Sequence, residues 1–156
     1  MLKKGASNEI GHSRGGASTK IHAIVDSYGY PVYFMISEGQ RNDINYAIPL
    51  LDHIEIDGSK VLADRGYDSN QLIDYIYDHG GEPTIPSRRG AKFERRCDWW
   101  FYKERHLVEN YFLKLKAFRR IATRYDKLAF TYLGFLCIVS ILILSLIHIS
   151  EPTRRR

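Results

Sequence analysis

The segment Tyr102–Lys116, YKERHLVENYFLKLK, constrains the fold most, because its residues separate into two chemically opposed faces at helical spacing. At about 100° per residue, one narrow polar stripe contains Tyr102, Arg105, Glu109 and Lys116. The opposite side gathers the apolar residues Leu107, Val108, Tyr111, Leu115 and Phe118. The pattern predicts a helix that lies on a core by its apolar face and presents a carboxylate between cations. Glu104 falls among the apolar positions, which indicates an irregular first turn.

Charge is distributed unevenly along the 156 residues, a length that suits one domain with a real core. Lys and Arg number 23 against 18 Asp and Glu, which gives a net charge of +5. Acidic residues concentrate in 44–82, whereas 88–127 and the two termini are basic. A basic segment next to a carboxylate favours a polyanionic partner, and nucleic acid is the commonest one.

The two cysteines, Cys97 and Cys137, lie far apart and outside any metal-binding spacing, so the sequence indicates neither a disulfide framework nor a zinc site. Residues 1–16 are polar and glycine-rich and do not have the pattern of a signal peptide. We therefore expect a protein with reduced thiols in the cytoplasm.

The amino-terminal third predicts a loop followed by a hairpin. Residues 1–18 are rich in glycine and have no apolar period, so we expect a flexible loop or arm. Such an arm either follows phosphates, through Arg14 or Lys20, or is a floppy terminus. Residues 19–26 and 31–37 alternate as strands around a turn that contains glycine.

Asp43 precedes an apolar helical pattern over 44–54 that contains Pro49, so we expect it to cap a helix with a kink or a late start. The alternative is that Asp43 faces a functional site. Asp68 likewise precedes a helical pattern over 70–80 and is expected to be an N-cap.

Asp64 lies at the carboxyl end of a short apolar strand expected over 60–65, directly before the turn at Gly66. Open α/β folds place reactive groups at this end of their strands. Asp64 is therefore a candidate catalytic carboxylate. The alternatives are a turn residue or a partner of Arg65.

Residues 82–87 contain two prolines and predict an edge strand. The next segment, 87–100, is a basic loop that ends in aromatic residues. Trp99, Trp100 and Phe101 either stack on bases or anchor the loop to the core, and we favour anchoring because three consecutive aromatics cannot all face solvent without cost.

The carboxyl-terminal part is first cationic and then apolar. Residues 118–127 carry Arg119, Arg120 and Arg124, and 132–147 are apolar nearly all round. The apolar run would rise only ~24 Å as a helix, less than the roughly 30 Å of a bilayer core, so we expect a terminal helix packed on the core rather than a membrane span.

Two motifs resemble the catalytic signatures of DDE transposases from bacterial insertion sequences. The first is Tyr-x2-Arg-x3-Glu-x6-Lys, which runs from Tyr102 to Lys116. The second, Asp-Arg-Gly-Tyr from Asp64 to Tyr67, is similar to the motif that carries the family's second catalytic aspartate. The alternative for the first motif is a solvated helix face with one i,i+4 ion pair.

The resemblance implies an α/β fold, an RNase H-like mixed sheet flanked by helices, with a helical segment at the carboxyl end. In that family the first of three catalytic aspartate and glutamate residues sits on a strand before the loop that corresponds to Gly11–Gly16. We therefore expect that the first strand is absent here, that 19–144 form a partial catalytic domain, and that 145–156 do not match the family's ending.

The implied chemistry is DNA strand cleavage and strand transfer with two Mg²⁺ or Mn²⁺ ions held by Asp64 and Glu109. Lys116 and Arg105 would hold the DNA backbone, and Tyr102 would position the strand end. Further expected DNA contacts are Arg14, Lys20, Arg88, Arg89, Lys114, Arg119, Arg120 and Arg124. The partners implied are transposon ends and target DNA, bound by paired protomers in the bacterial nucleoid.

We expect the full-length parent to be the enzyme and this chain to cleave little DNA by itself. Three other readings stay open. They are a non-catalytic DNA-binding remnant, a small membrane-associated protein, and an RNase H-like nuclease that acts on RNA.

Overall fold

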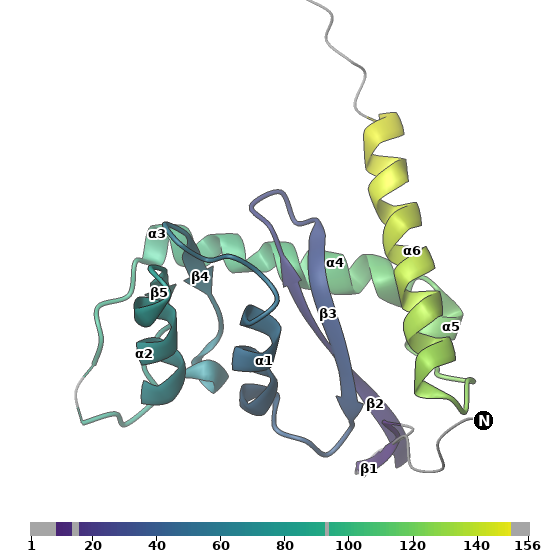
Figure 1. Cartoon of the computed structure of the whole chain (residues 1–156), viewed down its shortest axis with the longest axis horizontal. Coiled ribbons are helices and arrows are strands. Elements are labelled where there is room, and N and C mark those ends of the chain that lie inside the picture. Colours follow the sequence, from purple (N-terminus) through teal and green to yellow (C-terminus); the bar gives the residue numbers. More distant parts are fainter. Residues whose placement is uncertain (1–8, 14–15, 93, 151–156) are drawn as a thin grey trace, which may run out of the picture.

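The computed structural model describes residues 9–13, 16–92 and 94–150, which form two small sheets with helices packed against them (Figure 1). The first sheet is antiparallel and has the order β1-β2-β3, with β1 at Gly11–Ser13, β2 at Gly16–Val25 and β3 at Pro31–Glu38. The second sheet pairs β4, Lys60–Leu62, in parallel with β5, Glu82–Thr84. The expected mixed α/β class is confirmed.

The β2–β3 hairpin forms where the sequence predicts it, and its turn is held by Asp26. The Asp26 carboxylate accepts hydrogen bonds from the backbone N–H groups of Tyr28 and Tyr30, both at 2.9 Å. Gly29 takes a φ of +80°, which glycine adopts without strain. The hairpin is therefore fixed by turn chemistry as well as by strand alternation.

The expected loop over 1–18 is wrong for the part that the structure describes. Residues 11–13 pair with 16–18, in the register Gly11 opposite Ser18, and extend the sheet beyond the hairpin. The glycine-rich sequence has no strand period of its own, so the unpaired edge of β2 imposes this pairing. Residues 1–8 and 14–15 lie outside the described residues.

Both capping predictions for aspartates are wrong. The first helical turn is η1, Asp43–Tyr46, whose N-cap is Asn42 without a side-chain cap bond; α1, Ala47–Leu51, follows. At α2, Asn70–Asp78, the N-cap is Ser69, whose hydroxyl accepts a hydrogen bond from the Leu72 N–H. Asp68 instead accepts from the backbone N–H of Arg88 at 2.8 Å and pairs with Arg95, so it holds the basic loop.

The segment with two faces is helical from residue 99 to residue 116, in three pieces. It comprises α3, Trp99–Tyr102, a 3₁₀ turn η3, Lys103–Arg105, and α4, His106–Lys116. The 3₁₀ turn contains the exposed Glu104, which confirms the irregular first turn expected there. In Figure 1, α4 runs behind the β2–β3 hairpin and connects the β4–β5 end of the molecule to the carboxyl-terminal helices α5, Arg119–Ala122, and α6, Ala129–Ser150.

Successive side chains of β2 point to opposite faces of the sheet, and each face packs against its own hydrophobic cluster. Ile21, Ala23 and Val25 pack toward a cluster formed by α4, α5 and α6, in which Tyr111 and Leu136 are 1% and 0% exposed. Ile24 packs toward a second cluster built from α1, α2 and Ile85. The sheet is therefore covered on both faces, and α4 is held in place by its buried side.

Helix α6 packs one side on the core and exposes the other. Tyr132, Leu136, Val139 and Ile143 are buried, whereas Ile138, Ile141 and Leu146 are more than half exposed. By length and composition alone, Ala129–Leu146 could cross a membrane, with 28% of that window buried against the rest of the chain. The expected short helix is wrong, because α6 runs over 22 residues to Ser150, while the expected packing on the core is confirmed for its buried side.

Candidate active site

Asp64 follows β4 and projects into a 3₁₀ turn, η2, Arg65–Tyr67. The Gly66 N–H donates to Asp64 Oδ1 at 2.8 Å, so this carboxylate caps the turn with one oxygen. The residue is exposed, and Oδ2 makes no hydrogen bond within the described part of the chain. A carboxylate fixed by one oxygen at the end of the half-buried strand β4 is available for a ligand through the other.

Glu109 lies in the first turn of α4 and is paired with Arg105. The two side chains approach to 2.6 Å between Arg105 Nη2 and Glu109 Oε1, and they are 28% and 54% exposed. Burial of the guanidinium acts to lower the pKa of Arg105, but the hydrogen bond and charge of Glu109, together with Tyr102 and Asp64, raise it overall. Because both carboxylates act on it, the same guanidinium lies within electrostatic range of each.

The other two residues of the polar stripe extend this arrangement along the helix. The Arg105 guanidinium carbon lies 5.6 Å from the centre of the Tyr102 ring. Lys116 is exposed at the end of α4, seven residues after Glu109, which places it ~10 Å along the same helix face. Ring, guanidinium, carboxylate and ammonium therefore follow one another along one side of the segment.

Tyr67 is a further candidate for the site that the two motifs did not single out, since it ends the 3₁₀ turn that Asp64 caps. Burial, followed by the charges of Asp43 and Asp64, raises the pKa of its phenol to about 12. A phenol is protonated at neutral pH in any case, and this shift keeps the Tyr67 hydroxyl protonated, and able to donate a hydrogen bond, into strongly alkaline solution. Its position three residues after Asp64, across one 3₁₀ turn, is the signal that could have identified it.

Asp43 also lies on this side of the molecule, since it acts on the same phenol as Asp64. Its carboxylate pairs with Lys20 at 3.0 Å and approaches His22 Nδ1 at 3.8 Å. His22 is 4% exposed, stacks on Tyr46 and contacts the Ser37 hydroxyl at 2.7 Å through Nε2. This network binds β2, β3 and η1 together next to the candidate site.

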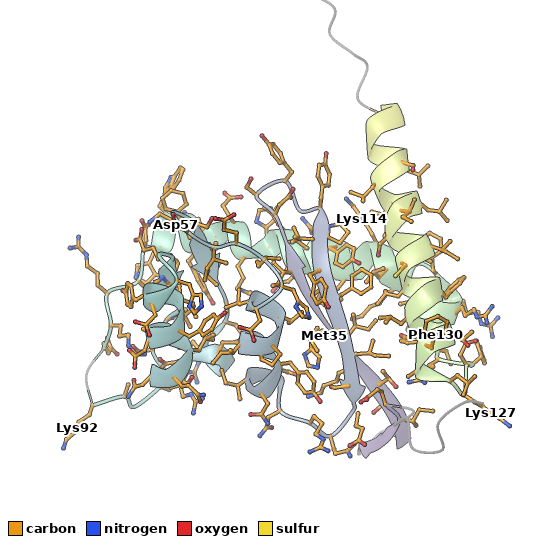
Figure 2. All side chains as sticks on the ribbon, viewed as in Figure 1. Met35, Asp57, Lys92, Lys114, Lys127 and Phe130 are labelled. Carbon is orange, nitrogen blue, oxygen red and sulfur yellow. The ribbon has the colours of Figure 1, made fainter. Side chains whose placement is uncertain are left out.

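The predicted DNA-contacting cations differ in how they are engaged. Arg88 and Arg89 are exposed in the loop between β5 and α3, whose outer tip carries Lys92 (Figure 2), and Lys114 and Arg119 are exposed near the end of α4. Arg120 makes two hydrogen bonds to Asp126, at 3.1 and 2.5 Å. Arg124 donates to the Asp126 carbonyl at 2.9 Å and to Thr19 Oγ1 at 2.5 Å. Arg14 lies outside the described residues.

The expected anchoring of the tryptophans is wrong. Trp99 and Trp100 are 55% and 70% exposed, while Phe101 is half-buried under the Lys60 ammonium, which lies 4.7 Å from its ring centre. Three consecutive helical residues point about 100° apart, so only one of them can face the body of the molecule.

The ligand chemistry of the two carboxylates suits a hard divalent cation such as Mg²⁺, which prefers oxygen donors. Asp64 Oδ2 and Glu109 Oε2 are both without a hydrogen bond among the described residues. Those residues contain no group of three or more His, Cys, Asp or Glu side chains that could hold a metal ion. Each of these two carboxylates therefore has an oxygen that could coordinate such an ion.

Residues 3–144 match the family model described as "Transposase DDE domain". The chain belongs to this family. The chain is also 35% identical over 122 residues, 76% of its length and 91% of the relative, to the "Putative transposase for insertion sequence element IS6501" of Brucella ovis. It is 31% identical over 133 residues, 79% of its length and 61% of the relative, to the "Putative transposase for insertion sequence element IS402" of Burkholderia cepacia. No solved structure matches it significantly.

Membership of the transposase DDE domain family confirms the resemblance drawn from the two motifs and gives the chain a role in DNA transposition. The family implies an RNase H-like fold, with which the mixed α/β arrangement of small sheets and helices is consistent. DNA is the partner of the family, and divalent metal ions are its cofactors.

Proposed function

We propose that this DDE domain contributes Asp64 and Glu109 to a metal-dependent site for cleavage and strand transfer of DNA. The observation that supports this most concerns the Arg105 guanidinium. It forms an ion pair with Glu109, and the charge of Asp64 contributes to its raised pKa. The two carboxylates come from a strand end and from a helix 45 positions later, 109 − 64, and Arg105 lies within electrostatic range of both.

The residues of the polar stripe have separate tasks in this proposal. Arg105 orients Glu109 and, with Lys116, neutralises the DNA phosphates next to the reacting one. Tyr102 supports the Arg105 guanidinium and positions the end of the strand. Divalent ions, when bound, would stabilise the charge on the attacking and leaving oxygens of the phosphodiester. Mg²⁺ or Mn²⁺, as two ions, suits this chemistry.

We infer that a third carboxylate completes the site from a strand outside the described residues. Strands β2 and β4 belong to separate sheets, and the resemblance assigns the first catalytic aspartate to a strand that precedes Gly11. A strand inserted between β2 and β4 would join the two sheets and carry its carboxylate toward Asp64. The chain by itself then binds metal weakly and cleaves little DNA.

A non-catalytic DNA-binding remnant is the second candidate function. It is favoured by the pair of carboxylates, rather than a triad, among the described residues. In that case only the basic surface of the loop and of the end of α4 acts, and binding does not respond to Mg²⁺.

A metal-dependent nicking assay distinguishes the two candidates. It compares the chain with a form extended upstream by one strand that ends in aspartate, each with and without Glu109→Gln. We expect Mg²⁺-dependent nicking by the extended form, abolished by Glu109→Gln, and little by the chain alone. Robust nicking by the chain alone, sensitive to Glu109→Gln, would contradict the missing carboxylate. No nicking by either form would favour the remnant.

We further propose a bacterial cytoplasmic location, in association with the nucleoid, and action as paired protomers on paired transposon ends. A basic surface beside a carboxylate supports the association with the nucleoid, because binding a polyanion is its simplest use. The paired action is what the resemblance to DDE transposases implies.

A further inference from the structure

An unbroken row of contacts leads from the exposed Trp99 to the candidate catalytic glutamate. The Trp99 and Tyr102 rings meet edge to face, with centroids 5.5 Å apart and an interplanar angle of 83°. Tyr102 in turn lies under the Arg105 guanidinium at 5.6 Å, and Arg105 is bonded to Glu109 at 2.6 Å. The 3₁₀ turn between α3 and α4 keeps these side chains on one side, because residues three apart eclipse in that geometry.

The backbone around Trp99 is fixed by hydrogen bonds, although the Trp99 indole is 55% exposed. The Asp98 carboxylate caps α3 by accepting from the N–H groups of Trp100 and Phe101 at 3.1 and 3.3 Å. The Tyr102 N–H donates to the Asp98 carbonyl at 2.9 Å. An exposed indole on a capped helix start loses little freedom when a ligand covers it.

The surroundings of Trp99 suit a nucleic-acid strand. Trp99 lines an open cavity of about 500 Å³ together with Glu82, Arg96, Cys97 and Asp98. Arg96 is exposed there, while the Glu82 carboxylate is paired with Lys60 at 2.6 Å. The exposed Arg88 and Arg89 belong to the same loop. A flat π-face with cations beside it is the combination that binds single-stranded nucleic acid, through stacked bases and neutralised phosphates.

We propose that Trp99 stacks on an unpaired base of the DNA strand whose phosphate reacts at Asp64 and Glu109. The helical segment rises ~15 Å over the ten residues from Trp99 to Glu109. Successive nucleotides of one strand in a DNA duplex advance about 3.4 Å, and those of an extended unpaired strand advance further, so the stacked base lies at most roughly four nucleotides from the reacting phosphate. This inference rests on the proposed function and adds to it the distance, in nucleotides, between the stacked base and the reacting phosphate. It implies that the site takes a frayed or single-stranded DNA end.

The test compares Trp99→Ala with Trp100→Ala in the full chain. Trp100 is the matched control, because it is 70% exposed in the same helix but packs its ring against Phe101, away from the row. The probes are a blunt duplex and the same duplex with a six-nucleotide single-stranded overhang, at one fixed salt concentration. We expect Trp99→Ala to weaken binding of the overhang DNA by about tenfold, with blunt-duplex binding unchanged, and Trp100→Ala to change neither.

A second measurement locates the nucleotide that stacks on Trp99, and it does not depend on an alanine variant. In Trp100→Phe, Trp99 is the only tryptophan of the chain, which has two. Its fluorescence should be quenched by the overhang DNA and not by the blunt duplex, and 2-aminopurine moved along the overhang should respond most at one position. Trp99→Phe should retain most of the affinity, since it keeps a stacking face.

Two results separate the failure of this inference from the failure of the proposed function. If the chain binds DNA but Trp99→Ala and Trp100→Ala behave alike, or blunt and overhang DNA are affected equally, stacking by Trp99 is wrong and the proposed function stands. If neither DNA binds, both are wrong.

Discussion

Arg105 donates to Glu109 at 2.6 Å across one helical turn, and the charge of Asp64, from a different element, acts on the same guanidinium. We propose that the pair belongs to the metal-dependent site, in addition to being an i,i+4 contact on a helix surface. The two roles predict different consequences of mutation. A pair of this exposure contributes only a few tenths of a kcal/mol to folding, so its main effect should be on ligand binding.

Arg105→Lys should therefore change thermal stability little. Loss of a few tenths of a kcal/mol corresponds to a fall of about 1–2 °C in the Tm of a domain of this size. Differential scanning calorimetry measures it, with Arg41→Lys as the control because Arg41 pairs with Glu38 at 3.2 Å on the surface. A fall of more than about 5 °C for Arg105→Lys alone would show that the pair holds the fold rather than the site.

Lys116→Gln should weaken DNA binding and reduce its salt dependence. Each phosphate contact that is lost lowers the slope of log K against log salt by about 0.9. Titrations of a DNA duplex at several salt concentrations measure the slope, and Arg41→Gln serves as the control because that cation is already paired. An unchanged slope for Lys116→Gln would remove Lys116 from the DNA interface.

The buried hydroxyls between α4 and α6 should show an asymmetric response. Ser140 Oγ donates to the Leu136 carbonyl at 2.8 Å and lies 2.8 Å from the Tyr111 hydroxyl, which therefore donates to it. Ser140→Ala leaves the Tyr111 hydroxyl buried without an acceptor and should cost about 1–3 kcal/mol. Tyr111→Phe leaves Ser140 bonded and should cost about 1 kcal/mol.

Chemical denaturation measures both free energies of unfolding. Ser145→Ala is the control, because the exposed Ser145 makes the same bond to the carbonyl four residues back, at 2.9 Å, and should change stability by less than about 0.5 kcal/mol. Equal losses for Ser140→Ala and Ser145→Ala would contradict the packing of α6 on α4.

His22 should make stability fall as the solution becomes acidic. Burial lowers the pKa of this imidazole, opposed by Asp43 and aided by Lys20, so the folded state binds its proton less readily than the unfolded state does. The free energy of unfolding is then greatest above the ordinary pKa of about 6.5 and decreases as the pH falls below it.

His22→Gln should remove this part of the pH dependence, which denaturation between pH 5 and pH 8 would measure. His106→Gln, on the exposed side of α4, is the control. A parent protein that becomes more stable on acidification, or a variant with the same slope as the parent, would be inconsistent with a neutral, buried His22.

The sequence predicted the elements whose signals are local. The β2–β3 hairpin follows from alternation around a glycine turn, and the position of Asp64 after β4 follows from an apolar run that ends at a glycine. The two faces of the α4 segment follow from helical spacing, and the i,i+4 ion pair that the alternative reading of the motif expected is present between Arg105 and Glu109.

The failures have long-range causes. Asp43 and Asp68 stand where an aspartate commonly caps a helix, but each finds a cationic partner more than twenty residues away, Lys20 for one and Arg95 for the other. Spacing along the chain contains no information about such partners. The exposed tryptophans were also missed, since the rule that aromatics are buried does not say which of three consecutive ones faces the body of the molecule.

Paramagnetic broadening by Mn²⁺ in NMR spectra of the chain measures whether Asp64 and Glu109 bind divalent cations together. We predict that Mn²⁺ broadens the amide signals around Gly66 and around Glu109 in parallel, and that either Asp64→Asn or Glu109→Gln weakens the broadening at both places. Glu104→Gln, which changes an exposed carboxylate of the same segment, should have no effect. Broadening at only one of the two places, or broadening that each variant abolishes only in its own neighbourhood, would show that Asp64 and Glu109 do not share a metal site.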